Sequence, residues 1–225
     1  MPCGYGSKNN MNKAWEKGKR DSLSFYFHKL KEKAKQFNRV FPLPDYFDEM
    51  IGDEADVKIA DLGAGLFCTI GSTWPTAIIH ITASDLLADD FNKMLAEANI
   101  VPIIPIEKQN MEDLPYPDNL YDIVHCTNAL DHTPDPFAAL IEMQRICKPG
   151  GWIYLRHYAH VGKHQNYCGL HMWNIDYHEP DDCRIWNETG SMILSKAFPG
   201  FVTECKRVLP YEPENMVVSM FQKPL

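Results

Sequence analysis

A short apolar run that ends in an acid and two glycines constrains this chain more than any other feature. Residues 57–60 are largely apolar, Asp61 ends the run, and Gly63 and Gly65 follow at alternate positions. Such a run is typical of a buried strand. The glycines allow a tight turn and let the backbone approach a ligand at the carboxyl end of that strand. The stretch therefore predicts the nucleotide-binding edge of an α/β sheet, with an ordinary glycine turn as the alternative.

Length and cysteine usage set the broad class. A chain of 225 residues suits one α/β domain. It contains no apolar run of about 18 residues, so we expect no membrane span. The N-terminus has no apolar signal segment, and the seven cysteines include no C-x-x-C pair. We therefore expect a cytoplasmic protein with reduced thiols.

The charge is unevenly distributed along the chain. A net charge of −8 argues against a nucleic-acid-binding protein. The first 40 residues nevertheless carry ten of the 22 basic residues and only three of the 30 acidic ones. This basic segment either steers an anionic substrate or forms a solvated helix face.

Strand and helix patterns alternate along the chain. Helices are expected over 12–40, 45–51, 88–97 and from Pro134 to about 149. Strands are expected over 57–60, 77–83, 101–106, 121–127 and 152–158, the third of them at an edge because prolines interrupt it. Pro75 and Gly71 predict a short or irregular helix after the glycine turn. The alternation favours a parallel sheet with helices on both faces.

A second acid closes the second expected strand. Asp85 lies 24 residues after Asp61, about where a nucleotide-binding fold places the carboxylate that accepts the ribose hydroxyl protons. The alternative is that Asp85 caps the helix of residues 88–97.

Five motifs occur in the order found in one enzyme family. They are DLGAG at 61–65, Asp85, EDLPYPDNLYDIV at 112–124, NALDH at 128–132 and EMQRICKPGG at 142–151. In this order they resemble a class I S-adenosylmethionine-dependent methyltransferase, of the small-molecule branch that includes the ubiquinone/menaquinone-type enzymes. The resemblance covers residues 55–158.

The resemblance implies a Rossmann-like, mostly parallel sheet of seven strands with helices on both faces. Residues 201–206 and 215–222 would supply the last pair, which includes one antiparallel strand. The expected layout is a single domain with an N-terminal helical lid (1–52), a cofactor-binding core (53–158), a substrate-side insertion (159–190), and a C-terminal helix and strand pair (191–225).

The resemblance also implies a cofactor site for S-adenosylmethionine. Gly63 and Gly65 would approach its methionine part, Asp61 would orient the loop or meet the amino group, and Asp85 would bind the ribose. Asn110 and Met111 would flank the adenine, Asn128 would lie near the methyl group, and Leu86 is a further expected cofactor contact. Two departures stand out: Phe67 replaces a glycine that is frequent in the family, and Asp131-His132 replaces the usual Glu-His.

The acceptor pocket is expected in the segment 156–176, after the fifth strand. His132 and His157 are the candidate general bases, needed if the methylated atom is a hydroxyl oxygen. Expected substrate-binding residues are Tyr26, Arg156, Tyr158, His160, His171 and Trp173. In the lid, Lys17, Lys19 and Arg20 could meet the methionine carboxylate or an anionic acceptor. The string GLHMWN at 169–174 resembles a signature of methyltransferases from surface-glycan gene clusters, which favours a sugar or another polar acceptor.

Less specific interpretations of the same residues stay open. The histidines of the insertion show H-x2-H-x3-H spacing, unlike a helix-face zinc pair, and no thiolate pair accompanies them; we expect no metal site. Each histidine could simply satisfy local hydrogen bonds.

The predicted function is methyl transfer to an oxygen of a sugar, carboxylate or other anionic metabolite, by a monomer or homodimer. The alternatives are a protein or RNA methyltransferase and a cofactor-binding relative without catalysis.

Overall fold

A seven-stranded sheet forms the centre of the computed structural model, which describes residues 8–178, 181–211 and 214–225. The strand order is β3-β2-β1-β4-β5-β10-β9. The strands are β1 (Asp56–Leu62), β2 (Ile78–Asp85), β3 (Ile106–Lys108), β4 (Tyr121–Thr127), β5 (Cys147–Tyr158), β9 (Val202–Tyr211) and β10 (Glu214–Gln222). Neighbours are parallel from β3 to β5, whereas β10 runs antiparallel to both β5 and β9. The expected mostly parallel, Rossmann-like sheet is confirmed.

Helices and a small second sheet surround this sheet. The helical elements are α1 (Lys8–Phe37), η1 (Asp45–Phe47), α2 (Asp48–Ile51), α3 (Ala88–Glu97), η2 (Leu130–His132), α4 (Pro136–Ile146), α5 (Val161–His164) and α6 (Leu194–Ala197). The second sheet consists of β6 (Asn174–His178), β7 (Asp182–Trp186) and β8 (Ser191–Ile193). Among the described residues, no helix is both long and apolar enough to cross a membrane.

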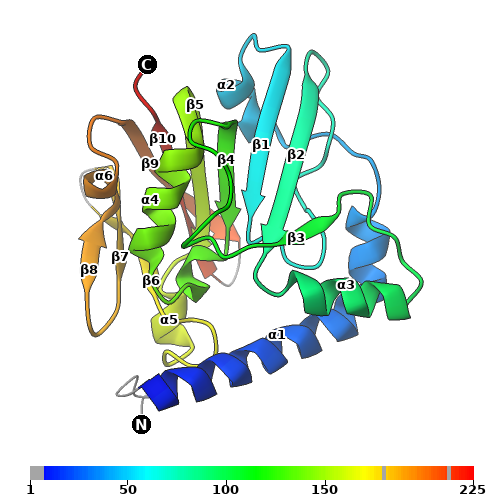
Figure 1. Cartoon of the computed structure of the whole chain (residues 1–225). Coiled ribbons are helices and arrows are strands. Elements are labelled where there is room, and N and C mark those ends of the chain that lie inside the picture. The colour runs from blue at the N-terminus through cyan, green and yellow to red at the C-terminus, as the bar shows by residue number, and fades with distance from the viewer. Residues whose placement is uncertain (1–7, 179–180, 212–213) are drawn as a thin grey trace.

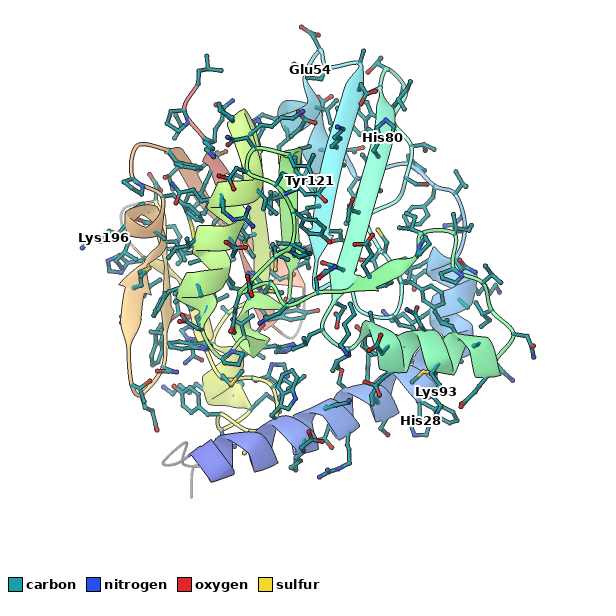
Figure 2. All side chains as sticks on the ribbon, viewed as in Figure 1. His28, Glu54, His80, Lys93, Tyr121 and Lys196 are labelled. Atoms are coloured by element: carbon teal, nitrogen blue, oxygen red, sulfur yellow. A yellow bond between two sulfur atoms is a disulfide. The ribbon has the colours of Figure 1, made fainter. Side chains whose placement is uncertain are left out.

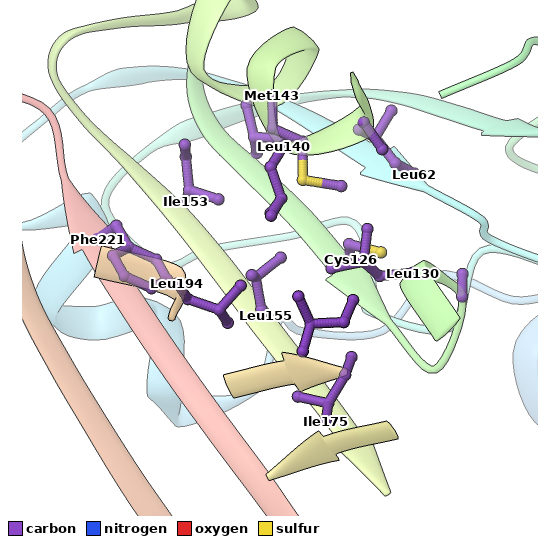
Figure 3. Close-up of a cluster of buried hydrophobic side chains, with 14 of the residues drawn as sticks. Leu62, Cys126, Leu130, Leu140, Met143, Ile153, Leu155, Ile175, Leu194 and Phe221 are labelled. Atoms are coloured by element: carbon purple, nitrogen blue, oxygen red, sulfur yellow. The ribbon is translucent and has the colours of Figure 1, made fainter. Parts of the chain in front are cut away.

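Each face of the large sheet buries its own apolar layer. On one face, Leu140 and Met143 of α4 and Ile175 of the small sheet share a buried apolar cluster with Leu155 of β5 (Figure 3). On the other face, the segment around η1 and α2 covers β1 and β4 with its own buried side chains. Burial of apolar area on both faces is the main force that holds such a layered fold together.

Helix α1 lies across the edge where β1, β2 and β4 end (Figure 1). Its Leu30 packs with Phe91 and Leu95 of α3 and with Leu66 and Phe67 of the glycine loop. Side chains project from this helix, from α3 and from the sheet edge into the space between them (Figure 2). Phe67, which stands where the family often has a glycine, is thus part of the apolar layer under α1.

Local signals in the sequence explain where the elements begin and end. Asp135 caps α4, because its carboxylate accepts the N–H groups of Phe137 and Ala138, and Pro136 stands at the first helical position. Residues 63–77, where a short or irregular helix was expected, contain no helix; they form turns, bends and one isolated bridge between Thr73 and Pro42. The edge strand expected at 101–106 begins only at Ile106, after the two prolines.

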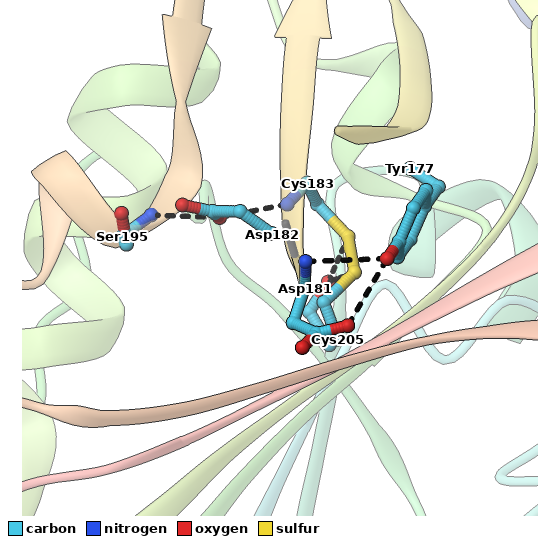
Figure 4. The surroundings of a disulfide bond; sticks show 7 residues. Tyr177, Asp181, Asp182, Cys183, Ser195 and Cys205 are labelled. Atoms are coloured by element: carbon cyan, nitrogen blue, oxygen red, sulfur yellow. Dashed lines mark hydrogen bonds between the residues drawn. A yellow bond between two sulfur atoms is a disulfide. The ribbon is translucent and has the colours of Figure 1, made fainter. Parts of the chain in front are cut away.

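The expectation of uniformly reduced thiols is wrong at one place. Cys183 of β7 and Cys205 of β9 form a disulfide that joins the small sheet to the edge of the large one (Figure 4). Among the described residues, Cys68, Cys126 and Cys147 are free thiols.

Candidate functional site

The glycine turn after β1 has no room for side chains. Gly63 and Gly65 have φ angles of 72° and 70°, in the left-handed region that favours glycine. A Cβ at Gly63 would lie 2.2 Å from the Cβ of Ala129, and one at Gly65 would lie 2.3 Å from the hydroxyl oxygen of Tyr26. The turn is held in place by Ser84, whose carbonyl oxygen accepts the N–H of Gly63 at 2.8 Å.

Asp85 faces this turn from the end of β2. One of its carboxylate oxygens accepts the N–H of Gly65 at 3.0 Å, and the other accepts the N–H of Leu87 at 2.8 Å. Burial raises the pKa of Asp85, although both N–H groups act to lower it. The alternative role as a helix cap is not seen: the N-cap of α3 is Leu87, and no side chain caps it.

Asp61 is buried beneath the turn and pairs with a histidine. Its Oδ1 lies 2.9 Å from Nδ1 of His125, whose Nε2 is 3.2 Å from the hydroxyl of Tyr46. The His125 ring lies almost parallel to that of Tyr154, with 5.3 Å between the ring centroids. Among the described residues, Oδ2 of Asp61 has no hydrogen-bond partner, so this carboxylate keeps one acceptor for a ligand or a water molecule.

A first cavity of about 110 Å³ opens beside the turn. Expected cofactor residues that line it are Gly63, Asp85, Leu86, Asn110, Met111 and Asn128. Helix α1 contributes Trp15, Ser22 and Tyr26 to its wall. Ligand pockets commonly measure about 300–1,000 Å³, so α1 leaves less room here than a nucleoside ligand needs. Phe67 does not line this cavity, so its bulk does not restrict it.

A second, larger cavity of about 610 Å³ lies between α1 and the segment 158–171. It shares Ser22, Tyr26, Asn128, His132 and Leu170 with the first cavity. At this junction Asn128 links the end of β4 to the end of β5. Its N–H donates to the carbonyl of Arg156, and its side-chain oxygen accepts the N–H of Tyr158. The two cavities are therefore adjoining compartments of one cleft.

Two histidines and a buried acid meet at the wall of the second cavity. His171 Nδ1 lies 2.9 Å from Oδ2 of Asp131, His132 Nε2 lies 3.3 Å from the same oxygen, and the two nitrogens are 3.1 Å apart. Burial acts to raise the pKa of Asp131, but the neighbouring imidazoles hold it below its ordinary value. Burial also lowers the pKa of His132, which favours the neutral ring.

Only part of the expected acceptor set reaches this cavity. Tyr26, Tyr158 and His171 line it. Arg156 instead lines a separate cavity, together with Tyr46 and Tyr154. His160 pairs with Asp176 at 2.8 Å.

The other two residues expected on the acceptor side, Trp173 and His157, are in the interior. Trp173 is buried and donates its indole N–H to the carbonyl of Thr133. His157 is fully buried, lines neither cavity, and has no hydrogen-bond partner for either ring nitrogen among the described residues. Burial lowers its pKa to about 4. The structure therefore brings His132, and not His157, to the cleft.

Two of the basic residues singled out in α1 have different surroundings. Lys17 lines the second cavity and forms an ion pair with Asp21 at 2.9 Å. Lys19 instead reaches Asp90 of α3 at 2.7 Å. Sequence reasoning missed Asp131, Ser22 and Leu170 as lining residues; for Asp131 the NALDH motif was the available signal, since the acid stands directly before the candidate base.

Comparisons with known proteins agree with this geometry. A family model described as a methyltransferase domain matches residues 60–155. The ubiquinone/menaquinone biosynthesis C-methyltransferase UbiE of Chromobacterium violaceum is 32% identical over 103 residues, which cover 46% of this chain and 41% of that relative. The chain spans less than half the length of these curated relatives, from 14% to 41%.

Two solved structures share the fold at low sequence identity. A Haloferax volcanii methyltransferase in complex with the Trm112 methyltransferase activator superposes with a TM-score of 0.58 at 16% identity, covering 90% of this chain and 98% of that one. Phosphoethanolamine N-methyltransferase 2 of Haemonchus contortus, solved with S-adenosylhomocysteine and phosphomonomethylethanolamine, gives 0.59 at 12% identity, over 92% and 60% of the two chains.

The family match covers the strands and turns that build the first cavity, and the sheet order and glycine turn agree with it. This chain therefore carries a methyltransferase domain at residues 60–155, and most of the chain shares its fold with solved methyltransferase structures.

Proposed function

We propose that this chain transfers the methyl group of S-adenosylmethionine to a small polar acceptor held in the second cavity. The observation that carries the proposal is the shared wall of the two cavities, formed in part by Asn128 and His132. The sulfonium methyl is already reactive, so holding a nucleophile in line with it supplies most of the catalysis. A cofactor in the first cavity would direct its methyl group toward this junction.

In this proposal each cofactor residue keeps the role that the family suggests. Asp85 binds the ribose hydroxyls, Asn110 and Met111 flank the adenine, and the turn at 63–65 meets the methionine part. Asp61 is held beneath the turn by its pair with His125, and its second oxygen can accept a hydrogen bond from a ligand or a water molecule. The N-terminal helix acts as a lid, because a cavity of about 110 Å³ has to widen before the cofactor enters.

His132 is the residue best placed to assist the transfer, because it lines both cavities. A neutral imidazole can accept the proton of an acceptor hydroxyl as the oxygen attacks the methyl carbon. His157 is not part of this proposal, since it is buried away from both cavities.

The lining of the second cavity favours a small, oxygen-rich acceptor such as a sugar or a carboxylate. Lys17, Lys33, Tyr158 and Gln165 give it donors for hydroxyl and anionic oxygens. A volume of about 610 Å³ is in the usual range for small-molecule sites. A protein or RNA acceptor fits less well, and the net charge of −8 opposes RNA.

The first test is calorimetric titration with S-adenosylmethionine and S-adenosylhomocysteine. The native chain should bind both, and Asp85→Asn should weaken binding by about tenfold or more, because a ribose contact that involves a charged group contributes about 1.5–3 kcal/mol. Asp53→Asn, at an exposed turn away from the cleft, is the matched control. Unchanged affinity in Asp85→Asn would contradict the assigned ribose site.

The acceptor class needs a second test. Radiolabelled cofactor is incubated with the chain and with separate metabolite, RNA and protein fractions. Label in hydroxylated or anionic metabolites is the expected result. Label in protein or RNA would select the alternative acceptor class, and cofactor binding with no turnover in any fraction would identify a non-catalytic relative.

A further inference from the structure

Three potential metal ligands converge on one point at the wall of the acceptor cavity. They are Oδ2 of Asp131, Nε2 of His132 and Nδ1 of His171, and they are separated by 2.9, 3.1 and 3.3 Å. Among the described residues, these three form a group of His, Cys, Asp or Glu side chains whose ligand atoms all lie within 4.8 Å of one another, close enough to bind one ion. From this geometry we infer that the chain binds a divalent transition-metal ion at Asp131, His132 and His171.

The three separations match the edges of a metal coordination shell. Tetrahedral bonds of about 2.0–2.1 Å place neighbouring ligand atoms about 3.3 Å apart. Octahedral bonds of about 2.1 Å place them about 3.0 Å apart. The observed triangle lies between these values, so a cation can sit above it without large movement of any of the three side chains.

Hydrogen bonds alone satisfy these three atoms poorly. Each facing nitrogen of His132 and His171 carries either one proton or one lone pair. If both carry protons, two N–H groups point at one another across 3.1 Å and compete for a single oxygen. If only one carries a proton, that proton is shared between an imidazole and the Asp131 carboxylate. A cation accepts all three lone pairs together.

The backbone holds the two ligand-bearing segments together although they are 40 residues apart in sequence. The N–H of Met172 donates to the carbonyl of Asp131 at 3.0 Å, and the indole of Trp173 donates to the carbonyl of Thr133 at 3.0 Å. Asp131 is itself buried within η2. The ligands are therefore positioned by the fold before a metal binds, which lowers the cost of ordering them.

The donor set indicates the kind of ion. Two imidazoles with one carboxylate suit Zn²⁺, Fe²⁺, Co²⁺ or Mn²⁺, whereas Mg²⁺ and Ca²⁺ prefer oxygen ligands. Three protein ligands leave coordination positions open, as in catalytic rather than structural sites. All three residues line the second cavity, so the open positions face the acceptor space.

The role of the site rests on the function proposed above. An acceptor hydroxyl bound to the cation releases its proton to water more readily, because the positive charge stabilises the alkoxide. The oxygen lone pair then forms the bond to the methyl carbon, and the carbon–sulfur bond breaks with its electrons left on sulfur. The sulfonium becomes the neutral thioether of S-adenosylhomocysteine. In this arrangement the metal, and not a free His132 imidazole, promotes the loss of the proton.

The test measures metal binding without any cofactor. The full chain, produced without a polyhistidine tag, is stripped with a chelator, dialysed against ZnCl₂ or CoCl₂ and analysed for metal content and for visible Co²⁺ absorption. One equivalent per chain is expected. His171→Ala and the more conservative Asp131→Asn should each reduce metal affinity at least tenfold. His164→Ala removes an exposed histidine of the same insertion and should keep full binding.

The outcomes separate the two proposals. Thermal unfolding of each variant shows whether it is folded, and the partly exposed His171 is the site where substitution should be tolerated best. The metal site is overturned if the stripped native chain takes up no more metal than His171→Ala, or if His164→Ala loses binding equally. Cofactor binding without metal binding would overturn the metal site and leave the methyltransferase proposal intact. Metal binding without cofactor binding would support the metal site and contradict the methyltransferase proposal.

Discussion

The hydroxyl oxygen of Tyr26 lies so close to Gly65 that a Cβ on that glycine would be only 2.3 Å from it. Gly65→Ala should therefore weaken S-adenosylmethionine binding by about tenfold or more, because the clash adds to the strain of about 1–2 kcal/mol at a positive φ. Adding Tyr26→Phe removes the clashing oxygen and should restore part of the affinity. Calorimetry on the single and double variants checks this; equal affinities with and without Tyr26→Phe would show that the helix does not press on the turn.

Helix α1 also touches the insertion closely, at Gly18. A Cβ there would lie 2.6 Å from the backbone nitrogen of Leu170 and 2.7 Å from the carbonyl carbon of Gly169. Gly18→Ala should lower the stability of the native chain by about 1–3 kcal/mol, the usual cost of overpacking, although alanine is the better helix former. Ser24→Ala, on the exposed side of α1, is the control. A Gly18→Ala chain that unfolds at a higher temperature than the native one would disprove the contact.

Buried His157 should make the fold sensitive to mild acid. Its pKa is about 4 in the native chain, against an ordinary value of 6.5. Between these values the unfolded chain binds more protons than the native one, so stability falls as the pH falls from about 6.5 to 4. The loss amounts to about 3 kcal/mol when complete.

The measurement for His157 is denaturant unfolding at several pH values. His157→Leu should flatten the pH dependence in that window, because the apolar side chain takes no proton and leaves no unpaired ring nitrogen. The exposed His164→Leu should leave the slope unchanged. An unaltered slope in His157→Leu would mean that other groups cause the acid sensitivity.

The Cys183–Cys205 disulfide should stabilise the edge of the sheet. It closes a loop with a sequence separation of 22, which corresponds to about 3 kcal/mol in the chain-entropy model. Reduction, or the variant Cys183→Ala with Cys205→Ala, should lower the unfolding temperature. Thiol titration of the denatured chain should find two fewer thiols without reductant than with it; equal counts would refute the bond.

Sequence reasoning predicts the cofactor side of the cleft better than the acceptor side. Asp61, the turn at 63–65 and Asp85 follow strands with clear apolar runs, and the carboxyl ends of parallel strands necessarily meet at one edge. Their grouping therefore follows from the order of strands, which the family resemblance implies and the sheet confirms.

The residues that line the acceptor side depend on where β5 ends and on how the segment that follows it folds back toward η2. Arg156 and Tyr158 share a side of β5 by the two-residue alternation of a strand, yet only Tyr158, the last residue of β5, reaches the cleft. His171 meets Asp131 because the insertion folds back onto η2 through backbone hydrogen bonds. No periodicity in the sequence encodes that return.

Helix α1, which is 30 residues long, lines both cavities. It contributes Trp15 and Tyr26 to the cofactor side and Lys17 and Phe25 to the acceptor side. If the helix moves as one rigid body, it cannot open one cavity without also changing the wall that it forms in the other. Exchange of S-adenosylhomocysteine for fresh cofactor should then disturb a bound acceptor, so the two ligands would enter and leave in a fixed sequence. Steady-state kinetics of this enzyme should therefore show a compulsory order of binding rather than independent access.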